Sequence, residues 1–284
     1  MRSVFVFFPF DLFGTGGCAA GADLLAAELA EILADNRRET APSRARAYTD
    51  AVTIKQLSLG NLTELADWRA KGRRVATQIL RSDDFLFWIS GNHLGVLPVH
   101  DAIARRRAAG HRDLIVQFDA HLDIHQFADC TRELSHGNFL LHVERPGPLL
   151  VNVGHREQLL TRPDIERVFA GNFEAAQVVR DPAGVLAAVQ TLAGEAEAIY
   201  FDLDCDVLDP AFFPAVGQPV PFGLSPQQLL MLMEALWSDR VRGFLVSEFD
   251  PARDDQDRSL AILTWLLERL LLRIHESPAA TSGR

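Results

Sequence analysis

The stretch Leu114-Ile-Val-Gln-Phe-Asp-Ala-His-Leu-Asp123 joins an apolar run to a series of alternating polar residues. Its first half is an almost continuous apolar run, and its second half places Asp119, His121 and Asp123 at alternate positions. Continuous apolar runs of this length are typical of strands in a parallel sheet that is covered on both faces. Ligands of such sheets bind beyond the carboxyl ends of the strands. The stretch therefore predicts a buried strand that delivers three polar side chains to a site.

Two other apolar runs end in a similar way. Ala198–Leu203 leads into Asp202-Leu-Asp-Cys-Asp206, which repeats the alternate carboxylates, and Phe85–Ile89 leads into Ser90-Gly-Asn-His93. Alternate residues of an extended backbone point to the same side. We therefore expect three strand ends to bring carboxylates and imidazoles to one edge of the sheet.

The chain as a whole alternates short apolar runs with longer segments of helical period. The expected strands are Val4–Phe8, Val52–Leu57, Phe85–Ile89, Leu114–Phe118, Leu149–Val153, Ala176–Val179, Ala198–Leu203 and Gly243–Ser247. The expected helices are Ala19–Ala34, Leu62–Leu80, Val96–Ala109, Pro163–Phe169, Gly184–Ala193, Pro226–Trp237 and Arg258–Ile274. This alternation predicts a single-domain α/β protein over residues 1–276, a three-layer α/β/α sandwich with a mainly parallel sheet. Residues 277–284 are expected to form a flexible tail.

The composition narrows the classes of protein further. Of the 284 residues, 48% are hydrophobic and 23% are charged, which excludes a wholly disordered chain. The formal net charge of −10 argues against a nucleic-acid partner. No apolar run reaches the ~20 residues that span a bilayer, so no membrane partner is expected. The run Val4–Phe10 is too short for a signal peptide and is interpreted as the first strand of a cytoplasmic protein. The three cysteines have no paired spacing, which predicts neither a disulfide framework nor a thiolate zinc site.

The clustered acids and imidazoles indicate a metal centre. Carboxylates brought together without a cation would repel one another and stay unsatisfied. A donor set with many carboxylates and few imidazoles suits manganese or a similar divalent ion better than a structural zinc. With His93 added to the two triplets, the donors are too many for one ion and match two. We therefore expect two Mn²⁺ ions as cofactors, which can activate a water for attack on an electrophilic carbon.

Motifs in order along the chain resemble those of the ureohydrolase superfamily, which comprises arginases, agmatinases and guanidino-acid hydrolases. They are Ser90-Gly-Asn-His93, Asp119-Ala-His-Leu-Asp123, His136-Gly137, Asp202-Leu-Asp-Cys-Asp-Val-Leu-Asp-Pro210 with Gly217-Gln-Pro219, and Glu248-Phe-Asp-Pro251. The resemblance covers nearly the whole chain. It implies an arginase-like fold and a metal-dependent amidinohydrolase that releases urea and an amine from a guanidino group.

The resemblance also implies which residues bind the metals. Asp209-Pro210 sets the register of the second carboxylate pair, and Asp119 and Asp204 match the ligands that bridge both ions. Asp202 then stands where the family has a serine, and Asn92 stands where it has an aspartate. The implied metal ligands are His93, Asp119, His121, Asp123, Asp204 and Asp206.

The resemblance implies three catalytic residues, one of which is the bridging Asp119. Glu248 matches the carboxylate that binds the substrate guanidinium, an expected partner for a planar cation. His136 matches the histidine that protonates the leaving amine, a role suited to a group that titrates near neutrality.

The positions that hold the amino-acid head group in arginases differ in this chain. His125, Cys130 and Arg132 replace Asn, Thr and Ser, and Leu159 replaces an Asp. Because a buried ammonium next to leucine would lack a partner, free arginine is not the expected substrate.

Two substrate classes stay open. The preferred one is an arginine side chain within a peptide, converted to ornithine as in peptide arginases. The alternative is a small guanidino compound such as agmatine, a guanidino acid or arginine, with His125 or Arg132 on a distal carboxylate. His155 is a further substrate-binding candidate beside Glu248. A non-catalytic metal-binding relative is the remaining interpretation, and the resemblance suggests a homo-oligomer.

Overall fold

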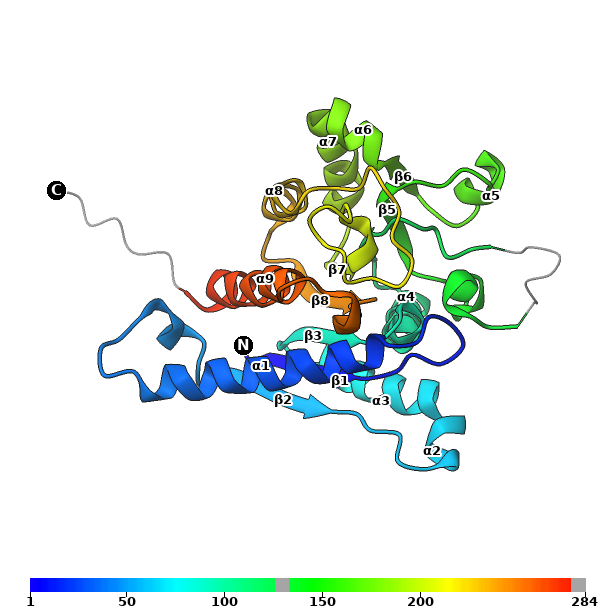
Figure 1. Ribbon diagram of the computed structural model, residues 1–284. Coiled ribbons are helices and arrows are strands. Elements are labelled where there is room, and N and C mark those ends of the chain that lie inside the picture. The colour runs from blue at the N-terminus through cyan, green and yellow to red at the C-terminus, as the bar shows by residue number, and fades with distance from the viewer. Residues whose placement is uncertain (126–132, 277–284) are drawn as a thin grey trace.

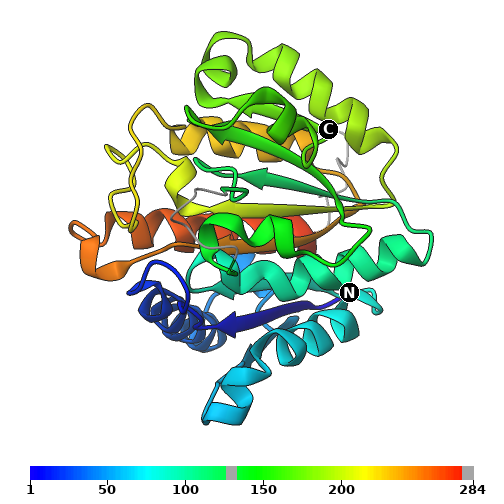
Figure 2. The same ribbon diagram turned by 90° about the vertical axis from the view of Figure 1, so that its right-hand side faces the viewer.

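A computed structural model describes residues 1–125 and 133–276 of the chain. Its core is one sheet of eight parallel strands in the order β2-β1-β3-β8-β7-β4-β5-β6. The strands are β1 Ser3–Phe8, β2 Val52–Gln56, β3 Phe85–Ser90, β4 Asp113–Phe118, β5 Leu149–His155, β6 Gly171–Glu174, β7 Ala198–Asp204 and β8 Val241–Ser247. In Figure 2 the strand arrows point the same way and helices lie on both sides of them.

Helices cover both faces of this sheet. They are α1 Cys18–Arg38, α2 Leu62–Ala66, α3 Trp68–Leu80, α4 Leu97–Ala108, α5 Arg162–Glu166, α6 Ala175–Arg180, α7 Pro182–Gly194, α8 Pro226–Leu236 and α9 Arg258–His275. One apolar core joins the sheet to α1, α6, α7, α8 and α9, and the other joins the opposite face to α3, α4 and α5 (Figure 1). The predicted three-layer α/β/α sandwich with a parallel sheet is confirmed.

Two expected elements are wrong in detail. Ala176–Val179 belongs to helix α6, and the sixth strand is the preceding Gly171–Glu174. A short apolar run fits a strand or a buried helix equally well, and an edge strand paired only with β5 needs little apolar character. The long expected helix over Leu62–Leu80 divides at Asp67 into α2 and α3. The expected tail, residues 277–284, lies outside the described residues.

The strand order explains where a site forms. Strands β3, β8, β7 and β4 are neighbours in the middle of the sheet, and being parallel they end at the same edge. The polar residues that follow these strands therefore converge, as expected for an open parallel sheet.

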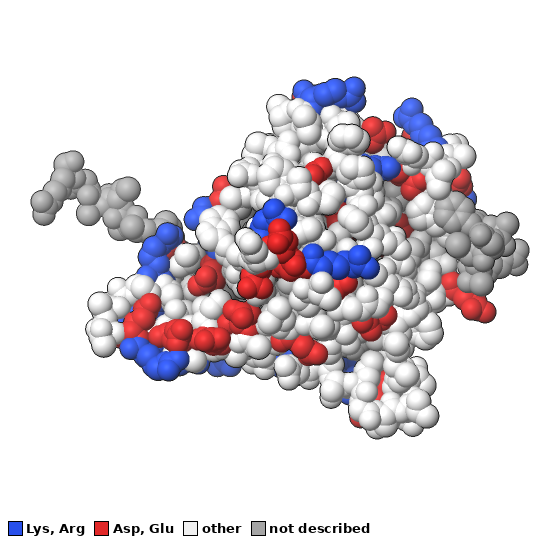
Figure 3. Space-filling model, in the orientation of Figure 1, with Lys and Arg blue, Asp and Glu red and all other residues white. Residues whose placement is uncertain are grey.

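The surface charge and the hydropathy of the helices bear on the partners that the chain can bind. On the face drawn in Figure 3, basic and acidic side chains are interspersed among the described residues, without the broad basic patch typical of nucleic-acid binding. Among the described residues, the structure contains no helix long and apolar enough to cross a membrane.

Candidate metal centre and active site

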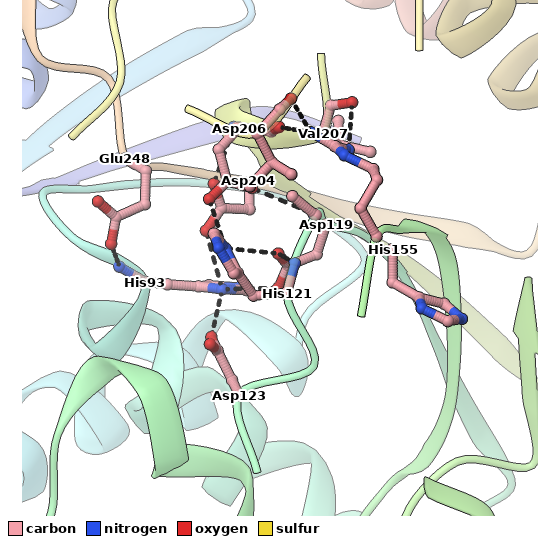
Figure 4. A network of polar contacts seen from close by, with 12 residues as sticks. His93, Asp119, His121, Asp123, His155, Asp204, Asp206, Val207 and Glu248 are labelled. Carbon is pink, nitrogen blue, oxygen red and sulfur yellow. Dashed lines mark hydrogen bonds and ion pairs between the residues drawn. The ribbon is translucent and has the colours of Figure 1, made fainter. Parts of the chain in front are cut away.

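His93 lies at the centre of a group of buried carboxylates. Its Nδ1 atom is 3.2 Å from Asp119 Oδ2, 2.9 Å from Asp123 Oδ2 and 3.1 Å from Asp204 Oδ2. The Nδ1 atom is buried and has no hydrogen-bond partner in the part of the chain that the structure describes. Figure 4 shows the ring pointing into the space that these side chains share. An imidazole nitrogen aimed at three carboxylate oxygens forms a ready donor set for a divalent cation.

A second donor set adjoins the first. His121 Nδ1 is 2.8 Å from Asp206 Oδ2 and 4.0 Å from Asp119 Oδ1. Ligand atoms of these three residues come close enough together to hold one ion, and so do those of His93, Asp119 and Asp123. Asp119 belongs to both sets, which is the arrangement required of a bridging carboxylate.

The electrostatics of the cluster fit a site built for cations. Burial and the neighbouring Asp123 raise the pKa of Asp119 from 3.8 to about 7. Burial, with Asp206 and Asp119 close by, likewise raises the pKa of Asp204 well above its ordinary value. Buried carboxylates are costly unless a charge balances them, so the chain is unfavourably charged until cations bind. The donors fit two divalent ions.

The raised pKa of Asp119 predicts that the stability of the metal-free protein depends on pH. Between pH values of about 4 and about 7 the folded protein keeps a proton on Asp119 that the unfolded chain has released. The metal-free protein is therefore expected to lose stability as the pH rises through this range. Denaturant midpoints measured at several pH values will show the slope. Asp119→Asn should reduce the slope, and midpoints that rise with pH in the metal-free protein would contradict the assignment.

Glu248 and His136 lie beside the first donor set. Glu248 has a left-handed backbone with φ 63°, and its amide donates to the Gly91 carbonyl at 2.8 Å. Its Oε1 accepts a hydrogen bond from the His93 backbone amide at 2.9 Å and is 3.4 Å from His136 Nδ1. A rare backbone conformation held by such contacts is typical of functional positions. The Glu248 carboxylate is thereby fixed close to both the first donor set and the candidate proton donor.

The loop between β1 and α1 holds His136 in place. The backbone amide of His136 donates to the Phe13 carbonyl at 3.1 Å. Gly14 lies so close that an added Cβ would be 2.5 Å from the ring. Burial lowers the pKa of His136, but the hydrogen bond to Glu248 and the nearby Asp123 outweigh it and leave the pKa raised. The ring can therefore carry a proton near neutral pH.

A cavity of about 630 Å³ opens above the donor sets. Both donor sets, His136 and Glu248 contribute to its lining. Leu159 and Phe222 also line it and are 71% and 83% exposed. The cavity thus runs from a charged base to a partly apolar mouth.

A family model for the arginase family matches residues 2–272 of the chain. The chain belongs to the arginase family. An agmatinase of Serratia proteamaculans is 30% identical over 201 residues, which are 70% of this chain and 63% of that protein. An agmatinase of Edwardsiella ictaluri is 30% identical over 219 residues, 76% of this chain and 68% of that protein.

Solved structures of the arginase family share the fold. An arginase of Entamoeba histolytica in complex with L-ornithine has a TM-score of 0.78 and 18% identity, covering 95% of this chain and 97% of that one. A hypothetical agmatinase of Burkholderia thailandensis has a TM-score of 0.75 and 24% identity, covering 97% and 86%. Membership of the arginase family implies a site for two divalent ions, and the donor sets around Asp119 fit such a site.

Sequence reasoning missed two polar residues that line the cavity of this arginase-family chain, Glu157 and Arg156. Glu157 is 3.2 Å from His125 Nε2 and accepts backbone hydrogen bonds from Leu159 and Leu160. Burial raises the pKa of Glu157, but these contacts outweigh it and hold the pKa at about 2. Asp202, which the sequence analysis named without assigning it a role, is buried beside His93.

Arg156, also missed, lines the cavity with its guanidinium already engaged. Its Nη1 donates to the carbonyls of Gly154 and Val207 at 2.9 Å each. Its Nη2 donates to the carbonyls of Asp206 and Val220 at 2.6 and 2.9 Å. These bonds hold the loop that follows β7 in place, so Arg156 stabilises the backbone of the cavity wall.

The remaining substrate-binding candidates are placed differently. His155 is buried, does not line the cavity, and points away from the donor sets in Figure 4. We therefore leave it out of the proposed site. Arg132 and Cys130 lie outside the described residues. Asn92 donates to the Leu12 carbonyl at 3.2 Å. This bond helps to hold the loop between β1 and α1, whose Phe13 and Gly14 contact His136.

Proposed function

We propose that the protein is a two-metal hydrolase that releases urea from the guanidino group of a small substrate, with agmatine as the first compound to test. The observation that carries this proposal is the pair of donor sets sharing Asp119, with Glu248 beside them at the base of the cavity. Agmatinases among the relatives support it.

The chain's own residues would bind and orient the substrate. Glu248 would pair with the planar guanidinium and hold its carbon over the donor sets. When bound, two divalent ions would activate a water as the nucleophile. His136, 3.4 Å from the Glu248 carboxylate, would give a proton to the leaving amine, so that urea and a primary amine result.

The charge of the cavity wall favours a substrate without a carboxylate. Glu157 is ionised, His125 faces it, and Arg156 is occupied by carbonyls. Apart from the histidines of the donor sets and His136 at the base, no cationic side chain among the described lining residues is left to bind a distal carboxylate. A cationic tail such as that of agmatine suits this wall better than a guanidino acid or free arginine. The order of preference drawn from the sequence, with the peptide first, is therefore reversed.

An arginine within a peptide is the second candidate. Like agmatine, its side chain brings no free carboxylate, and unlike agmatine it brings no ammonium. The exposed Leu159 and Phe222 at the mouth offer apolar contact to neighbouring residues. Such contact is the specific observation in its favour.

A matched substrate series tests these proposals. Agmatine, 4-guanidinobutyrate, arginine and a capped arginine share the guanidinium and differ in the groups at the far end: an ammonium, a carboxylate, both charges, or two neutral amides. A carboxylate left without a partner costs about 1–3 kcal/mol, so kcat/KM for arginine and 4-guanidinobutyrate should be roughly 5- to 150-fold below that for agmatine. Urea release by the manganese-loaded protein measures this. A preference for 4-guanidinobutyrate would overturn the charge argument, and a preference for capped arginine would establish the peptide candidate.

A further inference from the structure

Asp202 is a fully buried carboxylate that the proposed function does not use. It lies on β7, two residues before Asp204, and its exposed fraction is 0%. One oxygen, Oδ2, is 2.8 Å from His100 Nε2 and 3.4 Å from His93 Nε2, while Oδ1 has no partner among the described residues. Burying an ionised carboxylate lowers the stability of the fold unless hydrogen-bond donors or positive charges compensate for the lost hydration.

Both histidines contact Asp202 Oδ2, and this shared contact determines which ring nitrogen of each carries a proton. An ionised carboxylate only accepts hydrogen bonds, so the Nε2 atoms of His93 and His100 must both carry protons. In neutral His93 the lone pair is then on Nδ1, the atom that faces Asp119, Asp123 and Asp204. A carboxylate on the far nitrogen of a histidine ligand orients the ring and makes the metal-facing nitrogen more basic.

Packing also holds the side chains of His93, His100 and Asp202 in place. His100 lies on α4, is fully buried, and makes the shorter of the two contacts with Asp202, so it anchors the carboxylate. The Phe139 ring meets both imidazoles edge-on, with centroid distances of 4.9 Å to His93 and 5.5 Å to His100. Neither ring can turn without displacing this aromatic side chain.

We propose that Asp202 and His100 act as a positioning pair for His93, fixing its proton on Nε2 and thereby strengthening divalent-metal binding at the first donor set. The proposal rests on the two-metal site of the proposed function. It predicts an effect on one of the two ions. The second set uses His121 and Asp206, whereas the ion pairs of Asp202 among the described residues are with His93 and His100.

The test is a Mn²⁺ titration of the purified full chain, followed by calorimetry and by the electron paramagnetic resonance spectrum of the bound manganese. Asp202→Asn should weaken one of the two sites by about 10- to 100-fold and leave the other at its original affinity. At intermediate Mn²⁺ the spectrum should change from that of a coupled pair to that of an isolated ion. His100→Phe should act in the same direction, and His100→Gln, which can still donate to Asp202, should restore part of the affinity.

Asp113→Asn is the matched control. Asp113 is a buried carboxylate at the opposite end of the sheet, paired with Arg106 at 2.6 Å. Its loss should lower stability without changing either manganese affinity. Wild-type affinity at both sites in Asp202→Asn, or equal weakening of both, would overturn the proposal; if that variant does not fold, the comparison of His100→Phe with His100→Gln decides it. Because the readout is metal binding, failure of urea release would count against the proposed function alone.

Discussion

Asp119→Ala is expected to remove catalysis almost completely and to empty the metal centre. The residue contributes ligand atoms to both donor sets, so its loss affects both ions at once. Metal ions supply several kcal/mol of transition-state stabilisation in hydrolases of this kind, which corresponds to a fall in kcat of roughly 10³-fold or more. Elemental analysis of the purified variant and urea release in excess Mn²⁺ measure the two effects.

The control for this variant lies on the same strand. Asp113 is at the start of β4, and Asp119 follows its end. Asp113→Asn removes a buried carboxylate with its ion pair, but at the edge of the sheet remote from the donor sets. It should keep both metals and most activity. If Asp119→Ala kept two tightly bound ions, the bridging role assigned to Asp119 would be wrong.

Glu248→Gln is expected to give the second largest effect while leaving both metals bound. Glutamine keeps the size of the side chain and can still accept from the His93 amide, but it has no charge for a guanidinium. Charge-assisted hydrogen bonds contribute about 1.5–3 kcal/mol, so kcat/KM should fall roughly 10- to 150-fold.

Steady-state kinetics with agmatine, together with metal analysis and a thermal melt of the same preparation, separate this effect from damage to the site. An unchanged melting temperature and metal content with reduced kcat/KM would support a role in substrate binding. Full activity in the variant would place guanidinium recognition on another residue.

The sequence predicted the edge of the sheet at which the ligands meet. Asp119, His121 and Asp123 follow a continuous apolar run, and parallel strands of that kind end together. His93 could be added because it follows another such run. The structure brings these residues within hydrogen-bonding distance of one another's carboxylates or of Asp204 and Asp206.

Other parts of the site could not be predicted because they depend on contacts between distant segments. Arg156 bonds to backbone carbonyls of loops about fifty and sixty-four residues away, and any residue type can supply a carbonyl. His100 follows His93 by one turn of 3₁₀ helix and one of α-helix, and only the sheet places Asp202 between them. The sixth strand, Gly171–Glu174, has one large apolar residue and therefore gave no strand signal.

We propose that this chain hydrolyses a guanidino group with the help of two bound ions. The most direct measurement uses agmatine labelled with ¹³C at the guanidino carbon and follows the label by nuclear magnetic resonance. The manganese-loaded protein should convert it to labelled urea and an equal amount of the diamine, and chelation of the metal should stop the reaction until Mn²⁺ is restored. A folded protein that holds two Mn²⁺ ions yet forms no urea from agmatine, arginine or capped arginine would contradict the account.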